Sequence, residues 1–206
     1  MVKITGIIHT RTGIRVVLDT GSEYLLNSKD LPVTGFSEGA VFNQEEFVHL
    51  IVICQYPRAL NQAVTMLARR LYSTGEIRSR LLHAGFIPDV CDLVIYKLEK
   101  ENLLNDTEFC EQWIRYRMGR KYGPSVIRRE LQIKGISEDT IHSIMEKQDD
   151  SEKTQNAVLL ARKFWLRIKP GEDIHRSRKK VITSLVRKGY DWDTAKSACA
   201  VAEKGK

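Results

Sequence analysis

An internal repeat constrains this chain more than any other feature of its sequence. Three stretches align on a glycine, with apolar residues eight and four positions before it and an aspartate four positions after it. The three glycines are 50 and 54 residues apart. Self-similarity at such a period is typical of tandem supersecondary units, so the sequence predicts a repeat protein. The aligned positions are Ile77, Leu81, Gly85 and Asp89; Ile127, Leu131, Gly135 and Asp139; and Val181, Leu185, Gly189 and Asp193.

Each aligned stretch predicts the end of one helix and the start of the next. Residues four apart share a helix face, so the apolar pair is expected to point into a core. The glycine stands where many helices end with a residue at positive φ. The aspartate then falls in the first turn of the following helix, whose positive end favours a carboxylate. With upstream helices predicted at 58–71, 107–121 and 152–167, each unit has three helices.

Capping signals support these helix boundaries. Ser73 and Glu76 form the spacing of a capping box. Ser137 and Asp191 are suitable N-cap residues at the third helix of the second and third units. Pro88, like the proline of Gly123-Pro124, suits the first position of a helix.

Residues 1–56 predict a different kind of structure. β-Branched runs at 2–8, 14–18 and 23–26 predict strands in a hairpin or three-stranded meander. A helix is expected from about Asn43 to Cys54, before Pro57. The expected fold class is therefore mainly α, with three tandem three-helix repeats in an elongated array behind a small β-rich N-terminal domain. The expected domains are 1–56, 57–106, 107–151 and 152–206.

The formal charge of +7 is concentrated in the last quarter of the chain. Residues 1–56 hold 4 basic and 6 acidic side chains, whereas residues 152–206 hold 14 basic and 6 acidic ones, a net +8. Such asymmetry indicates an acidic partner, most often nucleic acid. The alternative is a solvated basic face that keeps the protein soluble.

In the second unit, cations alternate with the aromatic residues Trp113, Tyr116 and Tyr122. Cations beside aromatic rings can grip phosphates and stack on bases. The alternative is that Trp113 belongs to the core and the arginines only solvate the opposite helix face. The candidate binding residues of this unit are Arg115, Arg117, Arg120, Lys121, Arg128 and Arg129.

The third unit carries the richest group of cations. Arg176, Lys179 and Lys180 could share one side of a helix, and Arg187 would continue it. Such a stripe would make binding strongly dependent on salt, and nothing in its context predicts readout of base edges. The candidate binding residues of this unit are Arg162, Lys163, Arg167, Arg176, Arg178, Lys179, Lys180, Arg187 and Lys188.

Signals for catalysis, metal binding and membrane insertion are absent from the sequence. It has no G-x-x-x-x-G-K-[S/T], G-x-S-x-G or H-E-x-x-H motif, and its four cysteines form no C-x-x-C pair. No apolar run approaches the roughly 20 residues of a membrane span, and the first residues lack a secretory h-region. We expect a cytoplasmic, non-enzymatic protein without cofactor or metal. An enzyme with active-site residues distant in sequence is the remaining alternative.

Three stretches resemble the RecX regulatory proteins of bacteria. Residues 68–85, which begin Ala-Arg-Arg-Leu-Tyr-Ser, resemble the first repeat of that family, and residues 98–109 resemble the junction after it. Residues 123–136, from Gly-Pro to Lys-Gly-Ile, resemble its most recognisable stretch. The likeness covers about residues 57–204. A proline frequent near Tyr72 is absent, and Tyr190 stands where phenylalanine is common, which leaves the expected fold unchanged.

The resemblance implies a modulator of the RecA recombinase. RecX proteins are similar in binding the RecA–single-stranded-DNA filament in its helical groove and limiting its growth. They thereby restrain ATP hydrolysis, strand exchange and the SOS response. The implied partners are the RecA filament and single-stranded DNA of any sequence, bound by a monomer without catalytic residues. From the residues alone, a helix-turn-helix transcription regulator is the alternative, and it would bind selected duplex sites, usually as a dimer.

Overall fold

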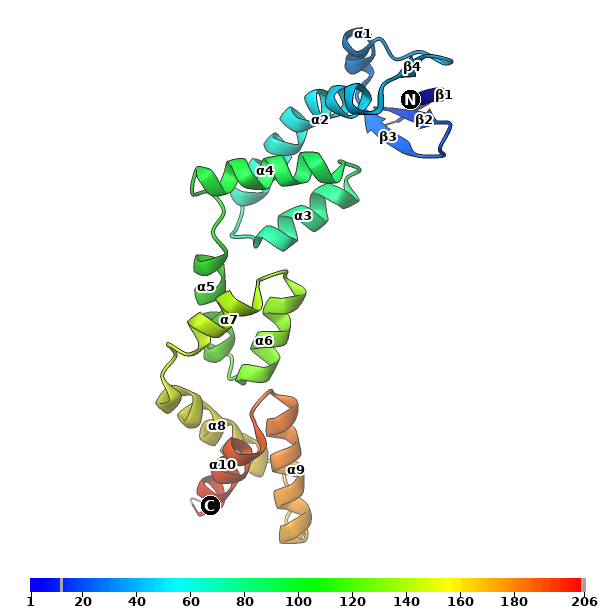
Figure 1. The fold of residues 1–206 in the computed structure, drawn as a ribbon. Helices are drawn as coiled ribbons and strands as arrows, with labels where there is room; N and C mark the ends of the chain where they lie inside the picture. Colours follow the sequence, from blue (N-terminus) through cyan, green and yellow to red (C-terminus); the bar gives the residue numbers. More distant parts are fainter. Residues whose placement is uncertain (12, 205–206) are drawn as a thin grey trace. The chain divides into compact units, whose positions relative to one another are not determined.

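The chain folds into two compact units, Met1–Asn105 and Asp106–Lys206. The computed structural model describes residues 1–11 and 13–204, and Figure 1 shows their secondary structure. Four strands lie near the N-terminus, and the rest of the described chain is mainly helical, as expected. Each unit is considered separately below.

The N-terminal sheet is antiparallel, with strand order β3-β2-β1-β4. Its core side follows from the alternation of the strands, since Ile4, Ile14 and Val16 are fully buried and intervening residues are exposed. The predicted meander is confirmed, and the short β4, which pairs with β1, was not predicted. The strands are β1 (Val2–Thr10), β2 (Gly13–Leu18), β3 (Glu23–Leu26) and β4 (Val41–Phe42), and the short helices η1 (Ser28–Asp30) and α1 (Leu31–Thr34) precede β4.

The helix α2 (Gln44–Leu67) runs through Pro57, so the predicted break before this proline is wrong. A proline removes one backbone hydrogen bond and strains a helix interior by about 3 kcal/mol or more. Burial along one face offsets this cost. Phe47 and Ile51 pack in the core of the sheet domain, and Ala59 and Ala63 pack in the core of the first repeat. The expected boundary between residues 56 and 57 therefore falls inside one continuous helix.

Gln55 fastens the sheet to the first repeat at the middle of α2. Its side chain is fully buried, and its Nε2 donates to the Leu25 carbonyl at 3.0 Å. Its Oε1 accepts from the backbone N–H of Ile87 at 2.9 Å. One buried amide thus satisfies polar backbone groups of β3 and of the α3–α4 turn. It connects the sheet to the first repeat within the N-terminal unit.

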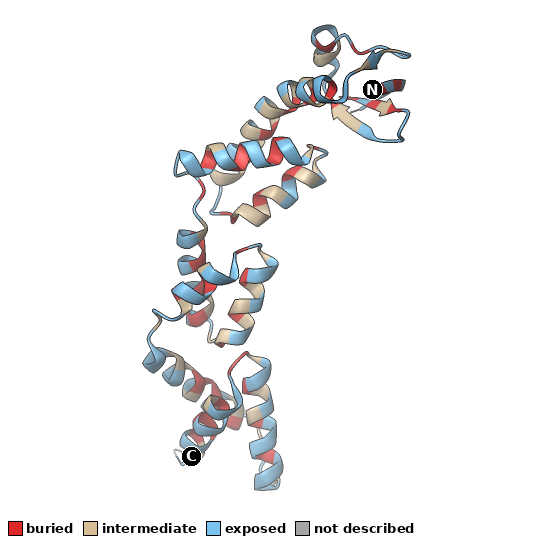
Figure 2. Cartoon of the chain, viewed as in Figure 1, coloured by how far each residue is buried: buried red, intermediate tan, exposed pale blue. Residues whose placement is uncertain are grey.

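Three three-helix repeats follow the sheet, as predicted. Each repeat has its own cluster of buried apolar residues, and Figure 2 shows the buried positions along the inner helix faces. The first repeat comprises the end of α2, α3 (Thr74–His83) and α4 (Pro88–Lys100). The second comprises α5 (Asp106–Gly119), α6 (Pro124–Ile133) and α7 (Glu138–Met145). The third comprises α8 (Asp150–Trp165), α9 (Ile174–Arg187) and α10 (Trp192–Lys204).

The repeat positions take the roles that the alignment predicts. All six apolar residues of the motif are at most 1% exposed. Gly85, Gly135 and Gly189 have φ of +88°, +80° and +99°. In each case the N–H of the next residue reaches back to the carbonyl of the apolar residue four before the glycine, at 3.2, 3.1 and 3.3 Å. This is the Schellman closure of a helix end. The motif aspartates lie in the first turns of α4, α7 and α10.

The predicted caps are also confirmed. Ser73 accepts from the Glu76 N–H at 3.1 Å, and the Glu76 side chain completes the capping box. Ser137 accepts from the Thr140 N–H at 3.2 Å. Such caps contribute about 1 kcal/mol each and define where each helix begins.

Repeats two and three are joined by a close backbone contact. The Gly123 N–H donates to the Lys188 carbonyl at 2.8 Å, and the Ser125 N–H donates to the Gly189 carbonyl at 3.0 Å. A Cβ on Gly123 would lie 2.3 Å from the Gly189 carbonyl carbon, so neither chain can approach so closely with a side chain there. The Tyr190 hydroxyl adds a bond of 3.3 Å to the Lys121 carbonyl. Gly189, which ends α9, therefore also contacts the backbone at the start of α6.

Candidate nucleic-acid interface

The cationic groove is a cavity of about 660 Å³ between α8 and α9 in the third repeat. Five of its ten lining residues are lysine or arginine, and no aspartate or glutamate lines it within the described part of the chain. The lining residues are Arg167, Arg176, Lys179, Lys180 and Arg187 together with Phe164, Ile168, Val181, Thr183 and Ser184.

The helix α9 brings most of these cations together. The spacing of these cations places them on one side of the helix. Lys179 and Lys180 follow Arg176 by three and four residues, and Arg187 follows Lys180 by seven. On the neighbouring side, Val181 and Leu185 are buried in the repeat core and hold α9 against α8. The groove therefore contains the four cations of the stripe expected from the sequence.

The end of α8 and the turn after it supply the remaining cation and an apolar floor. Trp165 is buried there, and its indole N–H donates to the Cys199 carbonyl of α10 at 3.3 Å. This anchor leaves Phe164 and Ile168 half-buried on the groove side and Arg167 exposed beside them. The groove thus offers an aromatic surface for stacking next to cations for phosphates.

Glu172, in the loop before α9, partly neutralises the groove. Its Oε1 lies 2.6 Å from Lys180 Nζ and 4.0 Å from Arg176 Nε, and its side chain is only 13% exposed. Across residues 1–11 and 13–204, Arg167, Lys179 and Arg187 make no ion pair. These three cations are the ones most open to a phosphate.

Other predicted binding cations make contacts inside the fold. Arg117 pairs with Glu130 and lies 3.8 Å from the centre of the Tyr122 ring. Lys188 lies 4.1 Å from the same ring, and it is the main cause of a lowered pKa of the Tyr122 hydroxyl. Arg117 is half-buried, so freeing it for a partner would cost these contacts.

Two more candidates form ion pairs at the surface. Arg128 pairs with Glu138 across the α6–α7 turn. Arg178 binds Glu203 through two hydrogen bonds of 2.8 Å, and this lowers the pKa of the Glu203 carboxyl. Both pairs are largely exposed, so they contribute little to the stability of the fold.

The remaining candidates are spread over the second and third repeats. Arg115 and Arg129 are exposed on α5 and α6, and Arg162 and Lys163 are exposed on α8 without lining the groove. Lys121 lies in the turn after α5, with φ of +60°. The structure therefore does not gather the fifteen predicted cations into one surface.

The aromatic cluster of the second repeat divides between core and surface. The Trp113 indole N–H donates to Glu130 at 3.1 Å, and the ring packs against Phe109 of the repeat core. Tyr116 remains 48% exposed, with Arg120 at 4.7 Å from its ring centre. For Trp113 the core interpretation is the better one, whereas Tyr116 and Arg120 stay accessible.

Phe164, Ile168 and Glu172 were missed by reasoning from the sequence. Phe164 precedes Arg167 by three residues, and Glu172 precedes Arg176 by four and Lys180 by eight. Arg167, Ile168 and Glu172 lie outside α8 and α9, so helical spacing alone does not place them beside these cations. The packing of α8 against α9 makes Phe164 and Ile168 a floor and Glu172 a counter-ion.

The described residues carry neither a metal cluster nor a bilayer-spanning helix. Within residues 1–11 and 13–204, no group of three His, Cys, Asp or Glu side chains is arranged to hold a metal ion. In the same part of the chain, no helix combines the length and hydropathy that crossing a bilayer requires.

The fold and the groove together define a tandem three-helix-repeat protein with a cation-lined surface. The family descriptions "RecX, first three-helix domain", "RecX, second three-helix domain" and "RecX, third three-helix domain" match residues 59–98, 105–143 and 150–199. The chain belongs to the RecX family of regulatory proteins.

Curated relatives agree with this assignment. A regulatory protein RecX from Prosthecochloris aestuarii is 35% identical over 138 residues, which are 66% of this chain and 88% of that protein. The namesake from Chromohalobacter salexigens is 32% identical over 142 residues, 69% of this chain and 91% of that protein. The one from Listeria welshimeri is 27% identical over 184 residues, 89% of this chain and 68% of that protein.

Solved structures show the same fold. A crystal structure of regulatory protein RecX superposes with a TM-score of 0.65 at 20% identity, covering 94% of this chain and 97% of that one. The crystal structure of RecX from Lactobacillus salivarius gives a TM-score of 0.67 at 24% identity, covering 73% of this chain and 97% of that one.

Proposed function

We propose that this protein is a non-enzymatic, chiefly negative modulator of the RecA recombinase. It binds the RecA–single-stranded-DNA filament in its groove and limits filament growth, ATP hydrolysis, strand exchange and SOS induction. The resemblance to RecX proteins implies this role, and the chain's membership of that family supports it. We further propose that the protein acts in the cytoplasm as a monomer, without cofactor or metal.

The observation that carries the proposal is the cationic groove of the third repeat. Its five cations surround an apolar floor that includes Phe164, and this combination suits a flexible single strand better than a rigid duplex. Each neutralised phosphate contributes about −0.7 to the slope of log K against log salt for single strands. The three cations without an ion pair would therefore give a slope of about −2.1, and all five cations together about −3.5.

The proposal is tested by titrating the protein into a RecA ATPase assay on single-stranded DNA. Wild type is expected to inhibit ATP hydrolysis at substoichiometric or equimolar ratios, and no inhibition at any ratio refutes the role. The variant Lys179→Glu/Arg187→Glu should inhibit less and bind single-stranded DNA with a shallower salt slope.

A matched control separates groove contacts from net charge. Lys196→Glu/Lys204→Glu changes the same charge on exposed residues of α10 that do not line the groove. This control should retain most binding and inhibition. Equal losses in both variants would show that only net charge matters.

A helix-turn-helix regulator predicts a different result. Competition between a selected duplex and random duplex would then show strong preference for one sequence. Equal competition by all sequences, with single strands preferred, is the outcome that we expect here.

A further inference from the structure

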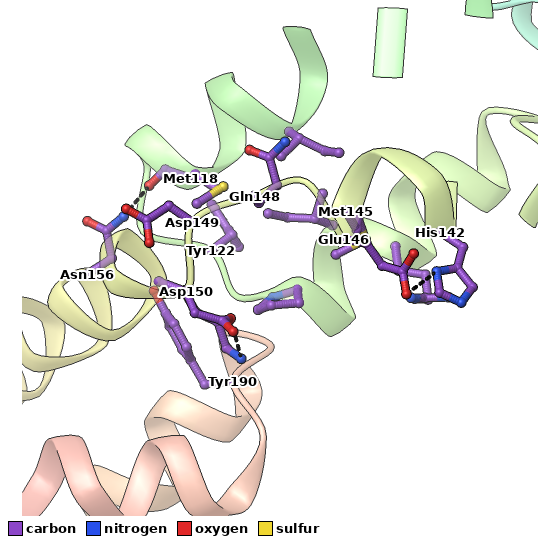
Figure 3. Close-up of a pocket in the computed structure, with 15 residues that line it drawn as sticks. Met118, Tyr122, His142, Met145, Glu146, Gln148, Asp149, Asp150, Asn156 and Tyr190 are labelled. Atoms are coloured by element: carbon purple, nitrogen blue, oxygen red, sulfur yellow. Dashed lines mark hydrogen bonds and ion pairs between the residues drawn. The ribbon is translucent and has the colours of Figure 1, made fainter. Parts of the chain in front are cut away.

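A second cavity lies at the joint between repeats two and three. Its volume is about 240 Å³, and it is separate from the cationic groove, with which it shares no lining residue. Figure 3 shows side chains reaching it from the end of α5, from α7 and the α7–α8 turn, and from Tyr190 after α9. The function proposed above makes no use of this cavity.

The inner wall of the joint cavity is apolar. Ile114, Met118 and Ile127 of repeat two and Tyr190 of repeat three are all less than 9% exposed. Met145 is half-buried at the wall. Methionine side chains adapt their shape to a guest, and the cavity contains two of the four methionines of the chain.

The size of the cavity limits what it can hold. Pockets for whole small-molecule ligands and cofactors usually measure about 300–1,000 Å³. An apolar cavity of about 150 Å³ suffices to enclose a benzene molecule. At about 240 Å³, the joint cavity fits one aromatic or long aliphatic side chain.

The rim of the cavity is acidic. Glu146, Asp149 and Asp150 stand on it, and the side chains of Glu146 and Asp150 are 70% and 93% exposed. The two basic rim residues are themselves paired with carboxylates: Arg128 pairs with Glu138, and Lys153 lies 3.6 Å from Asp150 and 3.7 Å from Asp191. His142 adds a weak contact of 3.5 Å to Glu146.

This charge pattern selects the kind of occupant. A nucleic-acid phosphate would meet three carboxylates against two cations that are already paired with carboxylates, and it would be repelled. A lysine or arginine of a protein partner would be attracted to the same carboxylates and would orient its apolar neighbour toward the cavity. A large side chain that fills a well-packed, desolvated pocket is typical of a binding hot spot.

We propose that the joint cavity is a protein-docking site that takes one aromatic or long aliphatic side chain flanked by a basic residue. This inference rests on the proposed function, in which the partner is the protein component of the RecA filament. The third repeat then binds DNA through the cationic groove, and the joint between repeats two and three binds protein through the cavity. The two contacts use opposite charges and separate surfaces.

The test is the double variant Glu146→Lys/Asp150→Lys in the full-length chain. Binding is measured to RecA–single-stranded-DNA filaments and, in parallel, to single-stranded DNA alone. We expect filament binding to weaken at least tenfold, with binding to DNA alone unchanged or tighter. The matched control Asp139→Lys/Asp193→Lys makes the same charge change at exposed residues that do not line the cavity, and it should retain filament binding.

A second variant probes the apolar wall without a change of charge. Met145→Ala removes a half-buried side chain of the wall and should weaken filament binding several-fold while leaving DNA binding unchanged. Melting curves of both variants verify folding. If Met145→Ala does not fold, the exposed charge variant still decides the matter.

The outcomes distinguish the two proposals. Unchanged filament binding by Glu146→Lys/Asp150→Lys, with impaired binding by the groove variant Lys179→Glu/Arg187→Glu, overturns the docking site and leaves the proposed function intact. Absence of filament binding by wild type overturns both. Weaker binding of the rim variant to DNA alone would make nucleic acid the occupant. A wild-type dimer that the rim variant dissociates would make a second copy the occupant, and both results overturn the inference.

Discussion

The substitution Gly123→Ala tests whether repeats two and three form one joined structure. The added Cβ would lie 2.3 Å from the Gly189 carbonyl carbon and 2.4 Å from its oxygen, distances that real Cβ atoms do not show. Both neighbours are backbone atoms, so no side-chain rotation can relieve the clash. The chain near Gly189 or the start of α6 must move instead.

The magnitude follows from the contacts that this movement breaks. Overpacking of this kind costs about 1–3 kcal/mol. Loss of the Gly123-to-Lys188 and Ser125-to-Gly189 hydrogen bonds adds about 0.5–1.5 kcal/mol each. Together these terms predict a destabilisation of the joint by about 2–6 kcal/mol. Each repeat keeps its own core, so the effect is expected at the joint first.

Hydrogen exchange and urea denaturation measure this effect. In Gly123→Ala, the protection of the Ser125 amide from exchange should fall at least tenfold. Unfolding of residues 106–206 should become less cooperative. Gly119→Ala is the control, since a Cβ there meets nothing within 4 Å and an alanine in a helix is more stable than glycine by up to about 1 kcal/mol. If Gly123→Ala matches this control in midpoint and in Ser125 protection, the joint does not exist as described.

Three further predictions concern other contacts. Gln55→Leu leaves the Ile87 N–H and the Leu25 carbonyl without their partner, so urea denaturation should show a loss of about 2–4 kcal/mol; a stability equal to wild type would contradict the bridging role. Glu172→Gln should release Lys180 and Arg176, tighten binding of single-stranded DNA and steepen the salt slope by up to about 1.4; weaker binding would contradict it. Asp191→Ala should cost about 1 kcal/mol at neutral pH because Asp191 caps α10. Hydrogen bonding from the Thr194 N–H lowers the pKa of Asp191, so this contribution is complete above the ordinary pKa of about 3.9 and is lost as pH falls through the lowered value. A difference between wild type and variant that persists in acid would refute the capping argument.

The repeat architecture could be predicted from the chain because its signals are local. An apolar pair four residues apart, a glycine and a first-turn aspartate specify a helix end and a helix start through short-range sterics and hydrogen bonding. The motif residues Leu131 and Gly135 therefore occupy the predicted positions. The break at Pro57 was predicted by the same local logic and is wrong, because burial of the α2 face on two cores outweighs the local cost.

The candidate site was predictable only in part. The stripe from Arg176 to Arg187 follows from helical spacing, and the structure places it along one groove. The sequence pattern could not separate Arg117, which is held by Glu130 and Tyr122, from exposed cations such as Lys179. An ion pair between α5 and α6 depends on how the two helices pack, and composition carries no record of that.

By itself, the amino-acid sequence determined the class of unit, the number of units, the three helix ends at Gly85, Gly135 and Gly189, and the concentration of positive charge in the third repeat. Each of these depends on residues within a few turns of one another. Only the tertiary structure decided which cations remain unpaired, that Gly123 meets Gly189, and that an apolar cavity with an acidic rim forms beside this joint. The last two features depend on the approach of segments about 65 residues apart, and the first depends on how neighbouring helices pack; close approach is set by packing and backbone hydrogen bonds that no local pattern encodes.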